Sequence, residues 1–305
     1  MKKTLVTFIT LVAAVFAAKA QTVETVQEYT NFSSIEASDY FEIKLVHGTS
    51  YSAKIVADQL IAENVQVFVK GSTLNLDVDE KKYAPEVKKA LKGKNAIVPV
   101  LRVEVTAPSI NSIKLNDNVI LTSQDNVKAD NVKIELAGNA NVKNLTLDAQ
   151  DVSIKLANKA QGRFDIYTNS ITVDAANNSS ANLVLNCSNI VVGTAGSANV
   201  VVNADTKSTA VKTQGSSTVT FTGNANKLKV EGSNSSNVLA DGMVVDDADV
   251  VLQNSSTCEI NAKDHLKVDL TGSSHLIFNG SPSIDVVKIV SSSMTRSSDT
   301  KSKRK

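Results

Sequence analysis

A short polar tetrad recurs about every 19 residues from Gly138 to His275, and this repeat constrains the fold more than any other feature of the chain. Apolar and polar residues alternate before and after each tetrad, which is the pattern of strands with one buried and one solvated face. The tetrads are GNAN at 138–141, ANKA at 157–160, NNSS at 177–180, GSAN at 196–199, GSST at 215–218, NSSN at 234–237, NSST at 254–257 and GSSH at 272–275.

Each repeat therefore reads as strand, polar turn, strand and connection, and two short strands cannot bury an inner face alone. Stacked repeats join their inner residues into continuous apolar ladders, so the sequence predicts an all-β solenoid with rungs of about 19 residues. We call the strands before the tetrads the first wall and the strands after them the second wall. The predicted inner residues of the first wall are Val132, Ile134, Leu136, Ile154, Leu156, Ile171, Val173, Leu228, Val230, Leu266, Val268 and Leu270, and those of the second wall are Leu145, Leu147, Phe164, Ile166, Leu183, Leu185, Val200, Val202, Val219, Phe221, Leu276 and Phe278.

The tetrads are predicted to be the corners between the two walls. Glycine and asparagine tolerate the left-handed backbone that sharp turns need, and serine and asparagine side chains hydrogen-bond turn amides locally. A nucleophilic serine needs a nearby base, and the repeats carry none beside each tetrad. We therefore interpret the repeated serines as structural.

Composition and charge exclude several classes of partner. The chain of 305 residues has no tryptophan and only 4% aromatic residues, which predicts a narrow aliphatic core. Its formal net charge of +1 gives no general attraction to nucleic acid or to a membrane surface. Lys301, Lys303, Arg304 and Lys305 form a basic terminus without interleaved aromatic residues, so we expect weak electrostatic surface contact at most and no nucleic-acid binding.

The first twenty residues have the pattern of a secretory signal peptide. Lys2 and Lys3 precede an apolar run at 5–18, which is too short to span a bilayer, and Ala18-Lys19-Ala20 predicts cleavage before Gln21. No later segment is long and apolar enough to anchor the chain. We expect an exported protein, located at the cell surface, outside the cell or in the periplasm.

The remaining chain is predicted to be one β-helix domain over residues 21–290. A short basic insert at about 79–97 interrupts its strands, with Pro85 at a first helical position and Gly93 closing the segment. Residues 291–305 are almost free of apolar side chains, and we expect them to form a disordered basic tail.

Several segments together resemble a known family. FSSIEASDYFEIKLVHGTSYSAKIVAD at 32–58, VKGSTLNLDV at 69–78, VPVLRVEVTAPSINSIKLNDN at 98–118 and the later GSS repeats resemble the putative auto-transporter adhesin, head GIN domain family, over about residues 30–285. The resemblance implies a right-handed single-stranded parallel β-helix and a role in adhesion to an unknown surface ligand, either a glycan or a protein. It implies no catalytic, cofactor-binding or metal-binding residue.

Two other functions remain open from the sequence. Parallel β-helices also carry polysaccharide lyases and glycosidases, which need clustered carboxylates on an exposed face. A periplasmic structural component of the envelope is the other alternative. The candidate residues for an enzyme are Asp246, Asp247, Asp249, Asp264, His265 and His275, and the first three are also candidate calcium ligands. We interpret the aspartates as a solvated connection between strands, and we expect the two histidines on different edges of the solenoid.

Overall fold

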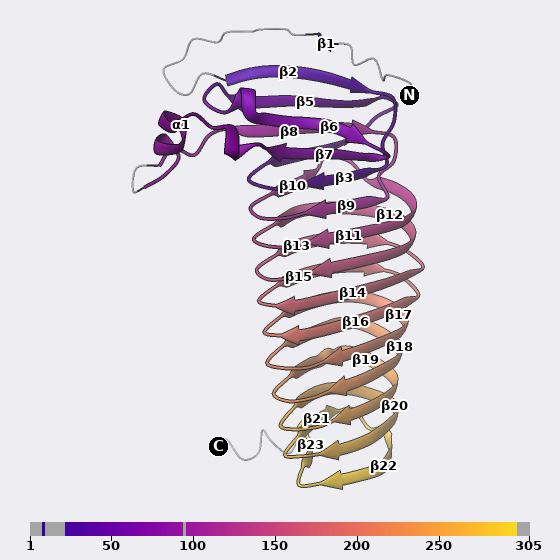
Figure 1. The fold of residues 1–305 in the computed structure, drawn as a ribbon. Coiled ribbons are helices and arrows are strands. Elements are labelled where there is room, and N and C mark those ends of the chain that lie inside the picture. The colour runs from indigo at the N-terminus through magenta and orange to yellow at the C-terminus, as the bar shows by residue number, and fades with distance from the viewer. Residues whose placement is uncertain (1–7, 10–21, 94–95, 298–305) are drawn as a thin grey trace. The chain divides into compact units, whose positions relative to one another are not determined.

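The structure is a computed structural model that describes residues 8–9, 22–93 and 96–297. These residues form a parallel β-solenoid of about ten turns with rungs about 19 residues apart, which confirms the predicted fold class (Figure 1). Most of the predicted signal peptide and the last eight residues lie outside the described residues. The contacts group the chain into two compact units: residues up to Ala129 with Ile134–Thr146, and Asp130–Lys133 with Leu147 onward.

The first unit contains parallel strands that end in antiparallel ones. On one wall β2, β5, β8, β4 and β10 lie side by side, and on the other β6, β7, β3 and β9 do; β2–β5, β5–β8 and β6–β7 are antiparallel. A two-residue strand, β1, pairs antiparallel with β2. The strands are β1 (Phe8–Ile9), β2 (Thr22–Tyr29), β3 (Ser34–Ala37), β4 (Glu42–His47), β5 (Tyr51–Asp58), β6 (Val65–Lys70), β7 (Thr73–Val78), β8 (Leu101–Ala107), β9 (Ser112–Leu115) and β10 (Ile120–Ser123).

The predicted insert contains the only α-helix of the described residues. Short 3-10 turns lie at Ala62–Asn64 and Glu80–Lys82, and α1 (Pro85–Ala90) follows the second of them. Pro85 occupies the start of α1, where its fixed φ and missing N–H do not disturb the helix. Gly93 follows with a φ of +97°. The position of the helix is therefore as the sequence indicated.

The second unit is a regular stack of parallel strands. Two strands, β11 (Val127–Leu136) and β12 (Asn141–Leu156), are divided between the units. Each of β17 to β20 is long because it forms the second wall of one rung and then the first wall of the next. The other strands are β13 (Gln161–Tyr167), β14 (Ser170–Asn177), β15 (Ser180–Asn186), β16 (Asn189–Gly196), β17 (Asn199–Thr213), β18 (Thr218–Gly232), β19 (Asn237–Leu252), β20 (Thr257–Thr271), β21 (His275–Asn279), β22 (Ser283–Val290) and β23 (Ser293–Arg296).

The core consists of the predicted aliphatic ladders. Every inner residue predicted for the two walls is buried, and the most exposed of them, Phe278, is only 8% exposed. Parallel pairing in register places equivalent inner residues one above another, as with Ile154, Val173 and Val192. The assignment of strand faces from the sequence is confirmed.

The tetrads are corners, and one backbone position defines them. Gly138, Asn177, Gly196, Gly215, Asn234, Asn254 and Gly272 begin their tetrads and all have positive φ, between 53° and 79°. The tetrad placed at 157–160 is the exception, because Asn158, its second residue, has the φ of +63°. The corner there begins one residue later than the sequence alignment placed it.

The residue two positions after the positive φ points inside the corner. It is alanine or serine in every tetrad, because the inner corner has room only for a small side chain. These residues are Ala140, Ala160, Ser179, Ala198, Ser217, Ser236, Ser256 and Ser274, each at most 1% exposed. The buried serines are hydrogen-bonded: Ser217 Oγ donates to Gln214 O at 2.8 Å and also lies 2.8 Å from Thr194 Oγ1 of the preceding rung.

The predicted disordered tail begins too early. Ser293–Arg296 forms β23, which pairs in parallel with β21 and places Met294 beside Leu276. Backbone hydrogen bonds to the previous rung need no apolar sequence, and so the stack continues one rung past the last tetrad. The prediction is wrong for Ser293–Arg296, and residues 298–305 lie outside the described residues.

Gly215→Ala tests how closely the corners stack. A Cβ at Gly215 would lie 2.7 Å from Gly196 O, whereas a Cβ at Gly71 would have nothing within 4 Å, although both glycines have positive φ. We expect Gly71→Ala to cost about 1 kcal/mol of unfolding free energy for the backbone conformation. Gly215→Ala should cost roughly 3 kcal/mol, because the backbone clash adds to that term. Chemical denaturation measures both, and equal losses would show that the corners are not in tight contact.

Ser217→Ala tests the buried serines. Ser217 is 0% exposed, whereas its neighbour Ser216 is exposed to solvent. Removing the Ser217 hydroxyl leaves the buried Thr194 hydroxyl and the Gln214 carbonyl each short of a hydrogen bond, so we expect a loss of about 1 to 2 kcal/mol in unfolding free energy. Ser216→Ala is the matched control and should change it by less than ~0.5 kcal/mol. A larger effect from Ser216→Ala would mean that the two side chains are assigned to the wrong sides of the corner.

Candidate functional site

The acidic and histidine residues singled out in the sequence lie on successive rungs of the second unit, but they do not converge. His265 begins the first-wall part of β20, where its Nδ1 lies 2.5 Å from Ser283 Oγ. His275 begins β21 on the second wall, where its Nδ1 lies 2.6 Å from Ser293 Oγ. The two imidazoles are therefore on different walls, as expected, and each contacts a serine of the next rung.

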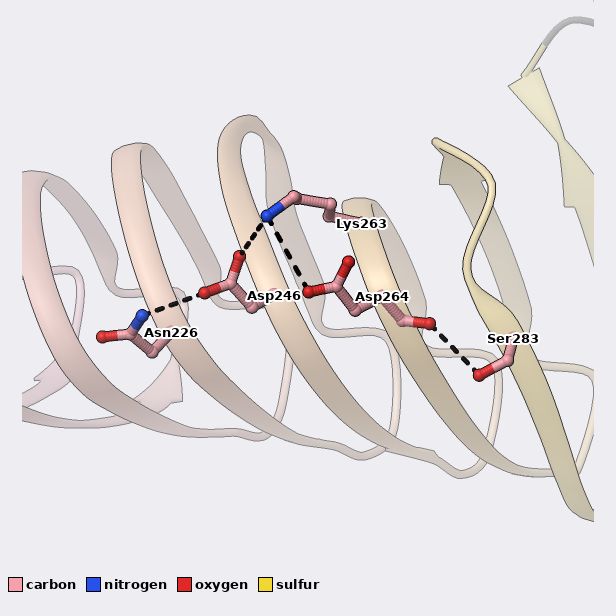
Figure 2. Close-up of polar contacts among 5 residues, drawn as sticks. All are labelled: Asn226, Asp246, Lys263, Asp264 and Ser283. Carbon is pink, nitrogen blue, oxygen red and sulfur yellow. Dashed lines mark hydrogen bonds and ion pairs between the residues drawn. The ribbon is translucent and has the colours of Figure 1, made fainter.

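Asp246 is the centre of a polar chain across four rungs (Figure 2). Its Oδ2 accepts a hydrogen bond from Asn226 Nδ2 at 2.9 Å, and its Oδ1 lies 3.3 Å from Lys263 Nζ. Lys263 Nζ also lies 3.8 Å from Asp264 Oδ2, and the Asp264 carbonyl accepts from Ser283 Oγ at 3.1 Å. The contacts Asn226–Asp246, Asp246–Lys263 and Asp264–Ser283 each join one rung to the next, so these residues link the stack along this edge.

The contacts in this polar chain favour the charged forms of Asp246 and Lys263. The Asn226 amide and then the Lys263 ammonium hold the pKa of Asp246 below its usual value. Asp246 in turn raises the pKa of Lys263. A general acid of a glycosidase needs a carboxyl pKa shifted in the opposite direction. Asp246 is therefore suited to an ion pair between rungs.

Asp247 and Asp249 lie outside this chain, on the outer face of the first wall. The outward residues of β17, β18, β19, β20 and β22 form three rows along the stack, which we call the charge ladder. The rows are Ser208, Lys227, Asp247, His265 and Ser283; Ala210, Lys229, Asp249, Lys267 and Asp285; and Lys212, Glu231, Val251, Asp269 and Lys288. Within each row, no charged residue stands directly beside one of like sign.

This alternation places a lysine or histidine beside each of the two aspartates. Asp247 stands between Lys227 and His265, and Asp249 stands between Lys229 and Lys267. Asp246 is held by Asn226 and Lys263 on a different edge. Over residues 22–93 and 96–297, no group of three or more histidine, cysteine, aspartate or glutamate side chains is placed to hold a metal ion.

A shallow depression runs along the charge ladder. It has a volume of about 660 Å³, and the outward-facing residues that line it are those of the first two rows of the charge ladder. A neighbouring depression of about 520 Å³ includes most of the third row. The lining of both lacks phenylalanine, tyrosine and tryptophan. The ladder is thus a polar, ridged surface with room for an extended ligand.

Sequence reasoning missed an acidic residue in the first unit. Asp39 has a positive φ of 67°, and its Oδ2 accepts from the Val78 amide at 2.8 Å. Burial raises the pKa of Asp39 to about 6, and the neighbouring Asp77 also raises it, while the Val78 amide opposes the shift. Only the register between β3 and β7 brings Asp39 to Val78, so no local pattern could have indicated it. The half-buried Asp39 carboxyl lies at a corner, equivalent to Asp117 on the next rung.

The molecule is a parallel β-solenoid, and the charge ladder on its first wall carries balanced positive and negative charges. The sequence matches the family described as putative auto-transporter adhesin, head GIN domain, over residues 31–183 and 163–282. The chain belongs to this family. No match is found among proteins with curated descriptions.

Two solved structures have the same fold. A putative adhesin from Parabacteroides distasonis is 16% identical, with 91% of this chain and 97% of that chain covered and a TM-score of 0.52. A putative adhesin from Parabacteroides merdae is 12% identical, with 90% and 95% covered and a TM-score of 0.51. At these identities the likeness concerns the fold alone. Within the part of the chain that the structure describes, no helix is long and apolar enough to cross a membrane.

Asp39→Asn tests the buried carboxyl. A folded-state pKa of about 6, against an unfolded value near 3.9, means that the native chain binds more protons between these pH values. Stability should therefore fall as pH rises from about 4 to 6 and then level off. Asparagine keeps an acceptor for Val78 and tolerates the positive φ, so we expect Asp39→Asn to match the original at pH 4 and to gain about 1 kcal/mol at pH 7, a value reduced for solvent screening.

Asp117→Asn is the matched control, since Asp117 occupies the same corner position with a φ of 57° but is exposed. Its unfolding free energy at pH 7 should lie within ~0.5 kcal/mol of that of the original protein. Thermal unfolding between pH 4 and pH 7 measures both variants. A flat profile for Asp39→Asn, parallel to the original at every pH, would contradict the assignment.

Proposed function

We propose that the protein is an exported, non-enzymatic binding protein that uses the depression on its charge ladder to hold an extended polar ligand at the cell surface. Export rests on the signal-peptide pattern of residues 1–20 and the predicted cleavage before Gln21. The adhesin-like character of the family supports a surface role. The ligand class follows from the chemistry of the ladder.

The observation that carries the proposal is the balance of charge around the depression. Three lysines, Lys227, Lys229 and Lys267, alternate with three aspartates on its rim, so the lining has no excess of either sign. Alternating donors and acceptors suit a neutral ligand rich in hydroxyl or amide groups. Polyanions such as nucleic acids need a surface with excess positive charge. A hydroxyl-rich glycan fits best, and an extended protein segment is the other candidate.

The absence of aromatic side chains around the depression suggests how the glycan would be held. Sugar rings would meet hydrogen-bonding side chains, without an aromatic ring to stack on. Each contact would then be weak, because a hydrogen bond exchanged with water contributes only about 1 kcal/mol. A polymer spanning several rungs would gain affinity by making such contacts repeatedly.

The enzyme alternative has less support from the arrangement of the carboxylates. In the depression Asp249 stands between two lysines and Asp247 between Lys227 and His265, and Asp246 has a lowered pKa on another edge. A periplasmic structural role would leave the fold unchanged and differs only in location. Location and binding are therefore the properties to measure.

The binding experiment fills the depression without changing its charge. Ala210→Tyr places a large side chain in the lining of the depression, and Asn203→Tyr places the same side chain on the outer face of the second wall of the preceding rung. Tyrosine is well tolerated in strands. With purified protein over immobilised bacterial and host glycans, we expect Ala210→Tyr to weaken binding at least ~10-fold and Asn203→Tyr to leave it unchanged.

Two further results bear on the proposal. Release of the protein by protease treatment of intact cells would support a surface location, and full protection would favour the periplasmic alternative. Cleavage of a bound polysaccharide by the purified protein would overturn the non-enzymatic assignment. Equal binding by Ala210→Tyr and Asn203→Tyr would remove the depression as the site.

A further inference from the structure

The last first-wall strand, β22, leaves its apolar side chains in solvent. All eight residues of β22 are exposed. Ile284, Val286 and Ile289 are 42%, 50% and 38% exposed, whereas the residues in register with them on β20, Leu266, Val268 and Leu270, are each 0% exposed. Side chains that form the core one rung earlier therefore have no cover on β22.

Among the described residues, no antiparallel strand like those that end the first unit pairs with β22. The first unit ends in antiparallel strands, β2 against β5 and β6 against β7. The sequence at 298–305, SDTKSKRK, contains no apolar side chain. Val287 and Val290, at 55% and 50% exposed, add to the apolar surface. An open strand of this kind is a template for pairing with another strand.

The charges of β22 indicate which strand would pair with it. Asp285 and Lys288 end two rows of the charge ladder, beside Lys267 and Asp269 respectively. Continuing the alternation requires a positive residue next to Asp285 and a negative residue next to Lys288. A second copy of β22, turned antiparallel, meets both requirements at once, since its Lys288 then faces Asp285 and its Asp285 faces Lys288.

We propose that two copies of the chain associate end to end through antiparallel pairing of β22 with β22. In this register Ile284 of each copy faces Ile289 of the other, and the central pair is Val286 with Val287. The contact is self-complementary, as a two-fold interface must be, and closes on itself. Two ion pairs and two isoleucine pairs then cover the side chains that the last rung exposes, and the sheet continues from one copy into the other.

Sedimentation of the purified protein tests the association directly. We expect a concentration-dependent equilibrium between monomer and dimer, with no larger species, because a two-fold contact uses up the free edge in both copies. Amide hydrogen exchange gives a second measurement without any substitution. The amides of residues 284–289 should become protected as concentration rises, while those of β2 should not change.

Charge reversal tests the register. Lys288→Glu and Asp285→Lys each place like charges opposite one another across the interface, so we expect each variant alone to dimerise at least ~10-fold more weakly. Mixed together they restore both ion pairs, Asp285 with Lys288 and Glu at 288 with Lys at 285, and should form a heterodimer. Each substitution also meets a like charge on β20, so circular dichroism must first show that both variants are folded. Lys212→Glu, a reversal far from β22 in the third row, is the control and should dimerise normally.

The outcomes separate the proposal from its competitors. A monomer at all concentrations, with unchanged exchange at 284–289, would overturn it. Open-ended oligomers would show a head-to-tail contact instead of the two-fold pair, and would overturn it as well. If a reversal variant fails to fold, the concentration dependence of hydrogen exchange in the original protein decides the matter.

Discussion

The contact between successive corners is the constraint on which the rest of the structure depends. Each corner turns through at least one residue with positive φ, and the backbone there lies so close to the previous corner that a Cβ on Gly215 or Gly196 would come within 3 Å of backbone atoms. Backbone hydrogen bonds join these corners, as from Ser216 N to Gly196 O at 2.7 Å. The corners fix the distance between rungs, and the walls follow because strands that leave equivalent corners must pair in register.

Register in turn decides which side chains meet, and charge distinguishes the correct register from its alternatives. Parallel stacking of near-identical repeats would place like residues beside like, which favours aliphatic ladders inside and penalises charges outside. The chain avoids the penalty by alternating sign from rung to rung. The first unit does the same, with Lys44 3.0 Å from Glu104 and Arg102 3.1 Å from Glu42. Each exposed pair contributes little stability alone. If a rung paired with the next rung but one, however, like charges such as Lys229 and Lys267 would lie side by side.

The sequence was sufficient for the walls and corners because both are local patterns. Alternation at period two identifies the inner residues whatever their neighbours are, and a recurring glycine or asparagine marks a positive φ. It could not separate Ser216 from Ser217, since only the turn geometry decides which serine points inward. The ordered strand at Ser293–Arg296 was missed because backbone pairing holds it, and composition does not report that. The pairings of Asp246 and the burial of Asp39 depend on residues far away in the chain.

The two proposed surfaces follow from the two directions that a solenoid has. Along the stack, each rung adds another set of outward side chains to a wall, so a lateral face lengthens without new structure and suits a polymeric ligand. At the end of the stack, the last rung exposes an edge strand and its inner side chains. In each earlier rung, the following rung covers these side chains. A contact that covers this edge with a second copy leaves the lateral faces free. It also doubles the number of ligand-binding faces in one particle, and linked weak sites can hold a polymer far more tightly than one site alone. For a face with no aromatic platform and no excess charge, such doubling supplies the affinity that single contacts lack.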